Sequence, residues 1–138
     1  MTRYCMTMTE GQAGLVIRAL GFFSRMRMGQ WHELIDLVLP VNGGDIDEYC
    51  KRRDEASRIL LDARKVLMPE LRDMHSLLGS YCVYNFEDSF AAWRTLQAIR
   101  SCIAWHNNPE GGWTVDFDMP FGDAPTVEAV DDACAGSV

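Results

Sequence analysis

The C-terminal quarter of this sequence lacks positive charge. Residues 101–138 contain no lysine or arginine but seven acidic residues, whereas residues 1–100 carry 13 basic and 13 acidic residues, so the net charge of -7 arises in the C-terminal quarter. Such a region repels phosphate backbones, so nucleic acid is not expected as a partner unless a basic face in the first 100 residues binds it. The acidic region is either a solvated tail that aids solubility or an alternative interface for a basic partner.

Long apolar runs and a secretory signal are also missing. The longest apolar stretches are far shorter than the ~20 residues that a membrane-spanning helix needs, and charged residues flank them. The N-terminus has no continuous apolar segment of the kind that secretory signals contain. We therefore expect no membrane span and a cytoplasmic location.

Motifs for catalysis and metal binding are absent from the sequence. The five cysteines are widely and irregularly spaced without a Cys-x-x-Cys pair, and the three histidines have no second ligand at helical or hairpin spacing. No nucleophile elbow, phosphate-binding loop or dinucleotide fingerprint occurs. We predict no catalytic residue, no metal and no cofactor. An enzyme would have to use Asp116, Asp118 and His106, the only candidates.

Helical periodicity is what the sequence does contain. Its 138 residues are 48% hydrophobic and 24% charged, ordinary values for one globular domain, which we place at residues 1–130, followed by a flexible acidic tail at 131–138. Capping boxes at Thr9 and Asp45 begin two helices, and a sustained apolar stripe follows the second of them. The predicted helices cover about residues 10–26, 30–39, 46–67 and 86–105.

One later segment has the pattern of a strand. Residues 113–118 alternate between Trp113, Val115 and Phe117 on one side and polar residues on the other, which predicts a half-buried strand. Residues 3–8 and 126–130 are the available partners. The expected fold class is therefore α+β and mainly helical, with three to four helices packed with a small two- to three-stranded antiparallel sheet.

The connection between the first two predicted helices is the most unusual local stretch, Ser-Arg-Met-Arg-Met-Gly-Gln-Trp at residues 24–31. Methionine, arginine and tryptophan are enriched at protein interfaces, so this stretch is a candidate binding surface. Alternatively, its methionines and tryptophan pack the corner between the helices while its arginines cap the carbonyls at the helix end. A second candidate site is the end of the fourth helix, because function often lies at the ends of elements. The predicted binding residues are Arg25, Arg27, Met28, Gln30, Trp31, His106 and Asn107.

Two stretches also carry a family resemblance. Residues 24–31 (SRMRMGQW) and residues 104–120 (AWHNNPEGGWTVDFDMP) resemble a group of small uncharacterised proteins carried by phages and prophages of Gram-negative bacteria. That group has no established activity, so the resemblance assigns no functional residue. It implies a bacterial host cell as the place of action, and the excess of arginine over lysine, eleven to two, suits a GC-rich genome.

These patterns favour a binding protein over an enzyme. The first hypothesis is a phage-type accessory protein that binds a bacterial host protein and modulates its activity in defence or regulation. The second is a homo-oligomer that sequesters a small anionic ligand such as a signalling nucleotide, with arginines on the phosphates and aromatic residues stacking the base. An enzyme ranks third. A DNA mimic ranks fourth, because the net charge of -7 is modest and lies at one end of the chain.

Overall fold

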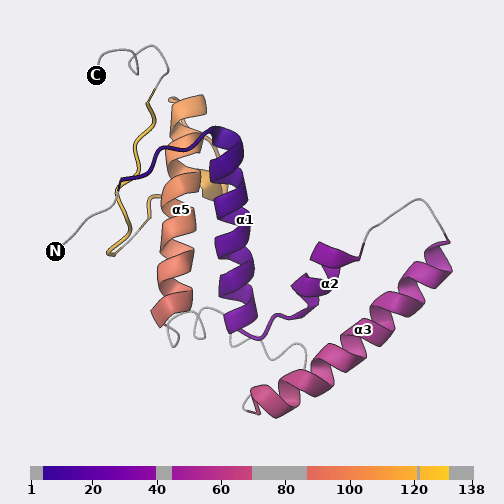
Figure 1. The fold of residues 1–138 in the computed structure, drawn as a ribbon. Helices are drawn as coiled ribbons and strands as arrows, with labels where there is room; N and C mark the ends of the chain where they lie inside the picture. Colours follow the sequence, from indigo (N-terminus) through magenta and orange to yellow (C-terminus); the bar gives the residue numbers. More distant parts are fainter. Residues whose placement is uncertain (1–4, 40–44, 70–86, 121, 131–138) are drawn as a thin grey trace. The chain divides into compact units, whose positions relative to one another are not determined.

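The computed structural model describes residues 5–39, 45–69, 87–120 and 122–130. Within these residues the chain is helical, and all four predicted helices are confirmed to within a few residues (Figure 1). The elements are α1 (Glu10–Arg27), α2 (His32–Val38), α3 (Ile46–Leu67), α5 (Glu87–Asn107) and a short 3-10 helix, η1 (Val115–Phe117).

Thr9 forms the predicted capping box of α1, whereas Asp45 caps α3 through the N–H of Asp47 instead of the N–H of Glu48 that a capping box uses. The backbone N–H of Thr9 donates to Gln12 Oε1 at 2.9 Å, and the N–H of Gln12 donates to Thr9 Oγ1 at 3.3 Å, which is a reciprocal capping box. Asp45 Oδ1 accepts from the N–H of Asp47 at 2.9 Å at the start of α3. These caps satisfy N–H groups that have no partner within the helix.

The chain divides into two compact units. Unit 1 comprises Met1–Gly21 and Ala91–Val138, and unit 2 comprises Phe22–Phe90. The predicted single domain over residues 1–130 stays a prediction, and the predicted tail at 131–138 lies outside the described residues. No helix in the described part of the chain is long and apolar enough to cross a membrane.

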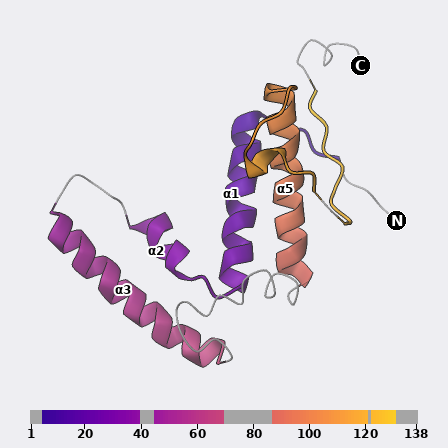
Figure 2. The same ribbon diagram turned by 180° about the vertical axis from the view of Figure 1, so that it is seen from behind.

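Within unit 1, the parts of α1 and α5 that belong to it run side by side in opposite directions (Figures 1 and 2). In unit 1, a Cβ atom added to Gly21 of α1 would lie 3.8 Å from Leu96 Cδ2 of α5. In unit 2, Ser24 and Ser89 are fully buried and their hydroxyl oxygens lie 3.0 Å apart. Small residues at these positions let the two helices approach closely. The buried apolar side chains of unit 1 are Ala13, Ala92, Leu96, Ala98 and Ile99.

Helices α2 and α3 pair within unit 2. Ile35 is the buried apolar side chain of α2, and Arg53 Nη2 of α3 donates to Asp36 Oδ1 at 3.3 Å. The hydrogen bond to Asp36 and then the charge of Asp36 raise the pKa of Arg53 above its ordinary value.

Part of the apolar stripe that predicted α3 is exposed, and the rest is half-buried. The helix is confirmed, but Ile46, Ile59, Val66 and Leu67 are all exposed, whereas the buried side chain of α3 is that of Arg64. Periodicity predicted the helix correctly because it depends on local spacing. It did not predict which positions another segment covers.

The predicted antiparallel sheet is wrong, since the described residues contain no β-strand and the chain is all-helical there. The alternating segment instead bends into η1, in which the N–H of Phe117 donates to the carbonyl of Thr114 at 3.1 Å. Neither residues 5–8 nor residues 126–130 form a strand, and Arg3 and Tyr4 lie outside the described residues.

A local aromatic contact explains why the alternation failed as a strand signal. Phe117 packs against Trp105 of α5, whereas Trp113 and Val115 are exposed. A half-buried strand needs one surface that covers every second side chain. Here only Phe117 is covered, by a residue of the preceding helix, so the alternating pattern does not correspond to one buried face.

Arg94 of α5 lies beside Gly122 and Asp123, near the end of the described chain. Arg94 Nη1 lies 3.9 Å from Asp123 Oδ2, and a Cβ atom added to Gly122 would lie 3.0 Å from the same guanidinium nitrogen. Gly122 has a positive φ of 74°, a conformation that favours glycine. Arg94 is therefore largely covered, with 16% of its side chain exposed.

Candidate functional site

The site predicted around residues 24–31 begins with a sharp end to α1. Gly29 has a φ of 76°, its N–H donates to the carbonyl of Met26 at 3.1 Å, and the N–H of Gln30 donates to the carbonyl of Arg25 at 2.9 Å. These two bonds form a Schellman motif, in which a left-handed glycine closes the helix. The chain can therefore turn directly into α2. We call residues 24–33 the α1–α2 corner.

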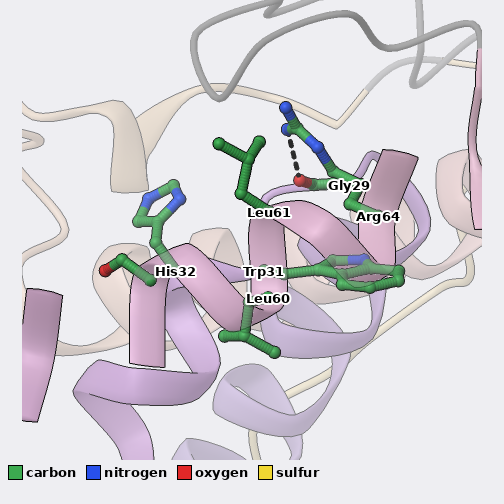
Figure 3. Close-up of a pocket in the computed structure, with 7 residues that line it drawn as sticks. Gly29, Trp31, His32, Leu60, Leu61 and Arg64 are labelled. Atoms are coloured by element: carbon green, nitrogen blue, oxygen red, sulfur yellow. Dashed lines mark hydrogen bonds between the residues drawn. The ribbon is translucent and has the colours of Figure 1, made fainter. Parts of the chain in front are cut away.

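Two side chains from different helices donate to carbonyls of this corner. Trp31 Nε1 donates to the carbonyl of Met26 at 3.0 Å, and Arg64 Nη1 of α3 donates to the carbonyl of Gly29 at 3.0 Å (Figure 3). Arg64 is only 4% exposed. A buried guanidinium needs hydrogen-bond acceptors, and carbonyls at a helix end have no partner within the helix. Trp31 and Arg64 therefore hold the corner in place.

The two predicted arginines of the corner form ion pairs with carboxylates. Arg25 Nη1 pairs with Glu33 Oε1, and Arg27 Nε lies 3.2 Å from Asp88 Oδ2. His32 Nε2 is 3.6 Å from the same Glu33 oxygen. The side chains of both arginines are slightly less than half exposed, so each has surface left for a partner while its charge is partly compensated.

A small hollow lies between the corner and α3 in unit 2. Its walls are made by Trp31 and His32 on one side and by residues of α3 on the other (Figure 3). Its enclosed volume is only ≈ 10 Å³, about the room for one water molecule, whereas the ≈ 220 Å³ of space around it includes open solvent. The hollow is therefore a shallow depression, far too small for a nucleotide. The lining residues are Gly29, Trp31, His32, Ser57, Leu60, Leu61 and Arg64.

The seven predicted binding residues do not form one cluster within either unit. Trp31 lines the hollow, and Met28 and Gln30 are half-buried in the α1–α2 corner. His106 and Asn107 are exposed at the end of α5, in unit 1. The candidate site in unit 2 therefore consists of the corner and the hollow, without His106 and Asn107.

One of the two carboxylates nominated for catalysis, that of Asp116, is engaged in an ion pair. Asp116 Oδ1 accepts from Arg100 Nε at 2.7 Å and from Arg100 Nη2, and Thr114 Oγ1 donates to Asp116 Oδ2 at 3.3 Å. Asp118 and His106 are exposed. Among the described residues, no group of three His, Cys, Asp or Glu side chains is arranged to hold a metal ion.

Sequence reasoning missed two residues. Arg64 occurs among the apolar positions of α3, four residues after Leu60 and three after Leu61, and a charged residue on an apolar helix face is a signal that it has a buried acceptor. Trp113 was assigned to the buried side of a strand but is fully exposed, at 106% of the reference area. No local pattern distinguishes it from Phe117.

Comparison of the chain with protein-family models finds no match, and comparisons with curated proteins and with solved structures find none either.

Proposed function

We propose that this chain is a phage-type accessory protein that binds a bacterial host protein and modulates its activity in defence or regulation. The observation that carries the proposal is the hollow beside the α1–α2 corner. It is lined by Trp31, His32, Leu60 and Leu61, and the ion-paired but accessible Arg25 belongs to the same corner. Aromatic residues and arginine are enriched at protein–protein interfaces, so this composition favours contact with a protein partner.

The geometry supports a protein partner more than a small anionic ligand. The hollow is smaller than typical ligand pockets, and the guanidinium of Arg64, which lines it, donates to the carbonyl of Gly29. The resemblance to small phage and prophage proteins is part of the same proposal, and so is the host cytoplasm as the place of action.

Affinity purification of the tagged chain from a Gram-negative bacterial lysate, followed by native mass spectrometry, tests the proposal. We expect one host protein to co-purify with the wild-type chain. Leu61→Glu places a charge in the hollow and should remove that protein. Ile59→Glu is the matched control, because it makes the same change on the same helix at an exposed position outside the hollow. It should retain the partner.

A second variant tests the corner itself. Arg27→Ala removes an accessible guanidinium that pairs with Asp88, and we expect it to weaken binding of the host protein. Circular dichroism should show unchanged helix content for every variant. A partner that binds Leu61→Glu and Arg27→Ala as well as wild type would refute the site, and a bound small molecule in place of a protein would support the anionic-ligand hypothesis instead.

A further inference from the structure

Trp113 is exposed to a degree that is unusual for tryptophan. Its relative exposure is 106%, compared with 41% for Trp105, which lies eight residues earlier. Val115 and Met119 of the same segment are also exposed, at 65% and 74%. Tryptophan and methionine supply large contact areas at interfaces, and tryptophan is over-represented among residues that dominate binding energy. We call Trp113, Val115 and Met119 the apolar tip.

The backbone that carries the apolar tip is constrained on both sides of Trp113. Before it, Asn108 Nδ2 donates to the carbonyl of Gly111 at 2.6 Å, and Gly111 has a φ of 85°. After it, Trp105 Nε1 donates to the carbonyl of Phe117 at 3.2 Å. A segment already held in place loses less conformational entropy when a partner binds, which favours affinity. The tip is thus an exposed apolar group on an ordered support.

Charge around the apolar tip points to the chemistry of its partner. Glu110, Asp116 and Asp118 lie within five residues of Trp113, and the chain contains no lysine or arginine after residue 100. Over its whole length, unit 1 has four arginines and eight carboxylates. Of the four arginines, Arg100 is paired with Asp116 and Arg94 lies near Asp123. A second copy of this acidic unit would be repelled, whereas a basic surface would be attracted.

We propose that the apolar tip is a second docking surface, which inserts Trp113 into an apolar pocket bordered by lysine or arginine on a partner protein. This surface belongs to unit 1, whereas the site of the proposed function belongs to unit 2, so either can fail without the other. The acidic residues beside the tip attract and orient the basic partner, and the side chain of Trp113 provides the main contact.

Peptide display on the full-length chain tests this inference. Random peptides are selected on the wild-type chain after depletion on Trp113→Ala, a variant that should unfold at the same urea concentration as wild type because the side chain is fully exposed. We expect enriched peptides to combine an apolar or aromatic residue with lysine or arginine. Fluorescence polarisation of labelled synthetic peptides should then show binding weakened about 30-fold or more by Trp113→Ala.

Two further variants and one ionic-strength series separate the contributions. Leu15→Ala is the matched control, since Leu15 is an exposed apolar residue of unit 1 outside the tip, and it should bind normally. Asp118→Asn should weaken binding several-fold and reduce its dependence on salt. Arg27→Ala, in unit 2, should leave peptide binding unchanged.

Several results would overturn the inference. The first is that no peptide survives the depletion step. The second is that the enriched peptides lack basic residues. The third is that a selected peptide keeps its affinity when its basic residues are replaced by glutamine. Sedimentation that shows a self-association lost in Trp113→Ala would assign the tip to a second copy of the chain. Binding of the tip to neutral phosphatidylcholine vesicles, detected as a blue shift of tryptophan emission that Trp113→Ala abolishes, would assign it to a membrane surface.

Discussion

Trp105 and Phe117 pack edge to face, with ring centroids 5.4 Å apart and an interplanar angle of 86°. The indole Nε1 of Trp105 also donates to the backbone carbonyl of Phe117 at 3.2 Å. Twelve residues separate the pair, so this contact closes the segment after α5 onto the end of the helix. An edge-to-face pair contributes about 0.5 to 1.5 kcal/mol beyond the area that it buries.

Gly112 is required by the position of the Phe117 ring. A Cβ atom added to Gly112 would lie 2.4 Å from Phe117 Cε2, so Gly112→Ala must displace the ring, at a cost of about 1 to 3 kcal/mol. In a Phe117→Ala background the same substitution should cost less than about 0.5 kcal/mol, because the clash is gone. Urea unfolding of the wild type, Gly112→Ala, Phe117→Ala and the double variant measures this coupling. Equal costs of Gly112→Ala in both backgrounds would contradict the contact.

Gly29 closes α1 in a left-handed conformation, so any side chain there is strained. Because Gly29 has a φ of 76°, the substitution Gly29→Ala should lower the free energy of unfolding by about 1 to 2 kcal/mol. Gly14→Ala is the control, since Gly14 is helical and its added Cβ would meet only the flexible end of Arg18 at 3.8 Å. That substitution should stabilise the chain by about 0.4 to 1 kcal/mol. Thermal or urea unfolding that ranks the two variants the other way would exclude the Schellman motif.

Ser24 and Ser89 form a buried polar contact between α1 and α5. Their hydroxyl oxygens are 3.0 Å apart, and Ser89 Oγ donates to the carbonyl of Ser24 at 3.2 Å. Ser89→Ala deprives the Ser24 hydroxyl of this partner and should cost about 1 to 3 kcal/mol, whereas adding Ser24→Ala should recover part of that loss because no hydroxyl is then left unsatisfied. Ser57→Ala serves as the control, because the Ser57 hydroxyl donates back to the carbonyl of Arg53 on its own helix and its loss should be nearly neutral.

A double-mutant cycle on equilibrium unfolding distinguishes this coupling from simple additivity. If Ser24→Ala and Ser89→Ala lower stability by amounts that add, the two hydroxyls do not depend on each other and the buried contact is refuted.

The ion pair of Arg100 and Asp116 should contribute modestly to stability. Both side chains are partly exposed, at 29% and 42%, so Asp116→Asn should lower the free energy of unfolding by about 0.5 to 1.5 kcal/mol, with a smaller effect at high ionic strength. Asp118→Asn is the matched control and should have almost no effect on stability, because Asp118 is exposed. A loss that is the same at low and high salt would show that the carboxylate acts mainly through short-range hydrogen bonds with Arg100, not through its charge.

Helix positions could be predicted because their signals are local. Thr9 and Asp45 begin α1 and α3 through hydrogen bonds that span two or three residues, so the side chains responsible are adjacent in the sequence. The end of α1 at Gly29 also follows from a short pattern, since glycine adopts the positive φ that the Schellman motif needs. The stretch at residues 24–31 could be singled out because its unusual residue types are also adjacent in the sequence. Its function as a binding site remains a prediction.

Burial could not be predicted, because it depends on segments far apart in the sequence. Arg64 is buried and donates to the carbonyl of Gly29, 35 residues away, whereas Ile59, Val66 and Leu67 of α3 are exposed although the same stripe would ordinarily indicate a core face. Periodicity states which side chains share a face of a helix, but it does not state whether another segment covers that face. The same reason makes Ser24 and Ser89 identifiable as partners only in the folded chain.

The sequence by itself determined four helices, the N-caps of α1 and α3, and an acidic C-terminal quarter, because helical hydrogen bonds and net charge depend on neighbouring residues or on composition alone. Only the tertiary structure decided that residues 113–118 form a loop with η1 instead of a strand, and that Phe117 is covered while Trp113 is exposed. Both aromatic residues occupy the same phase of one alternating pattern. The indole of Trp105 reaches only one of them, and that contact determines which aromatic residue supports the loop and which one is exposed.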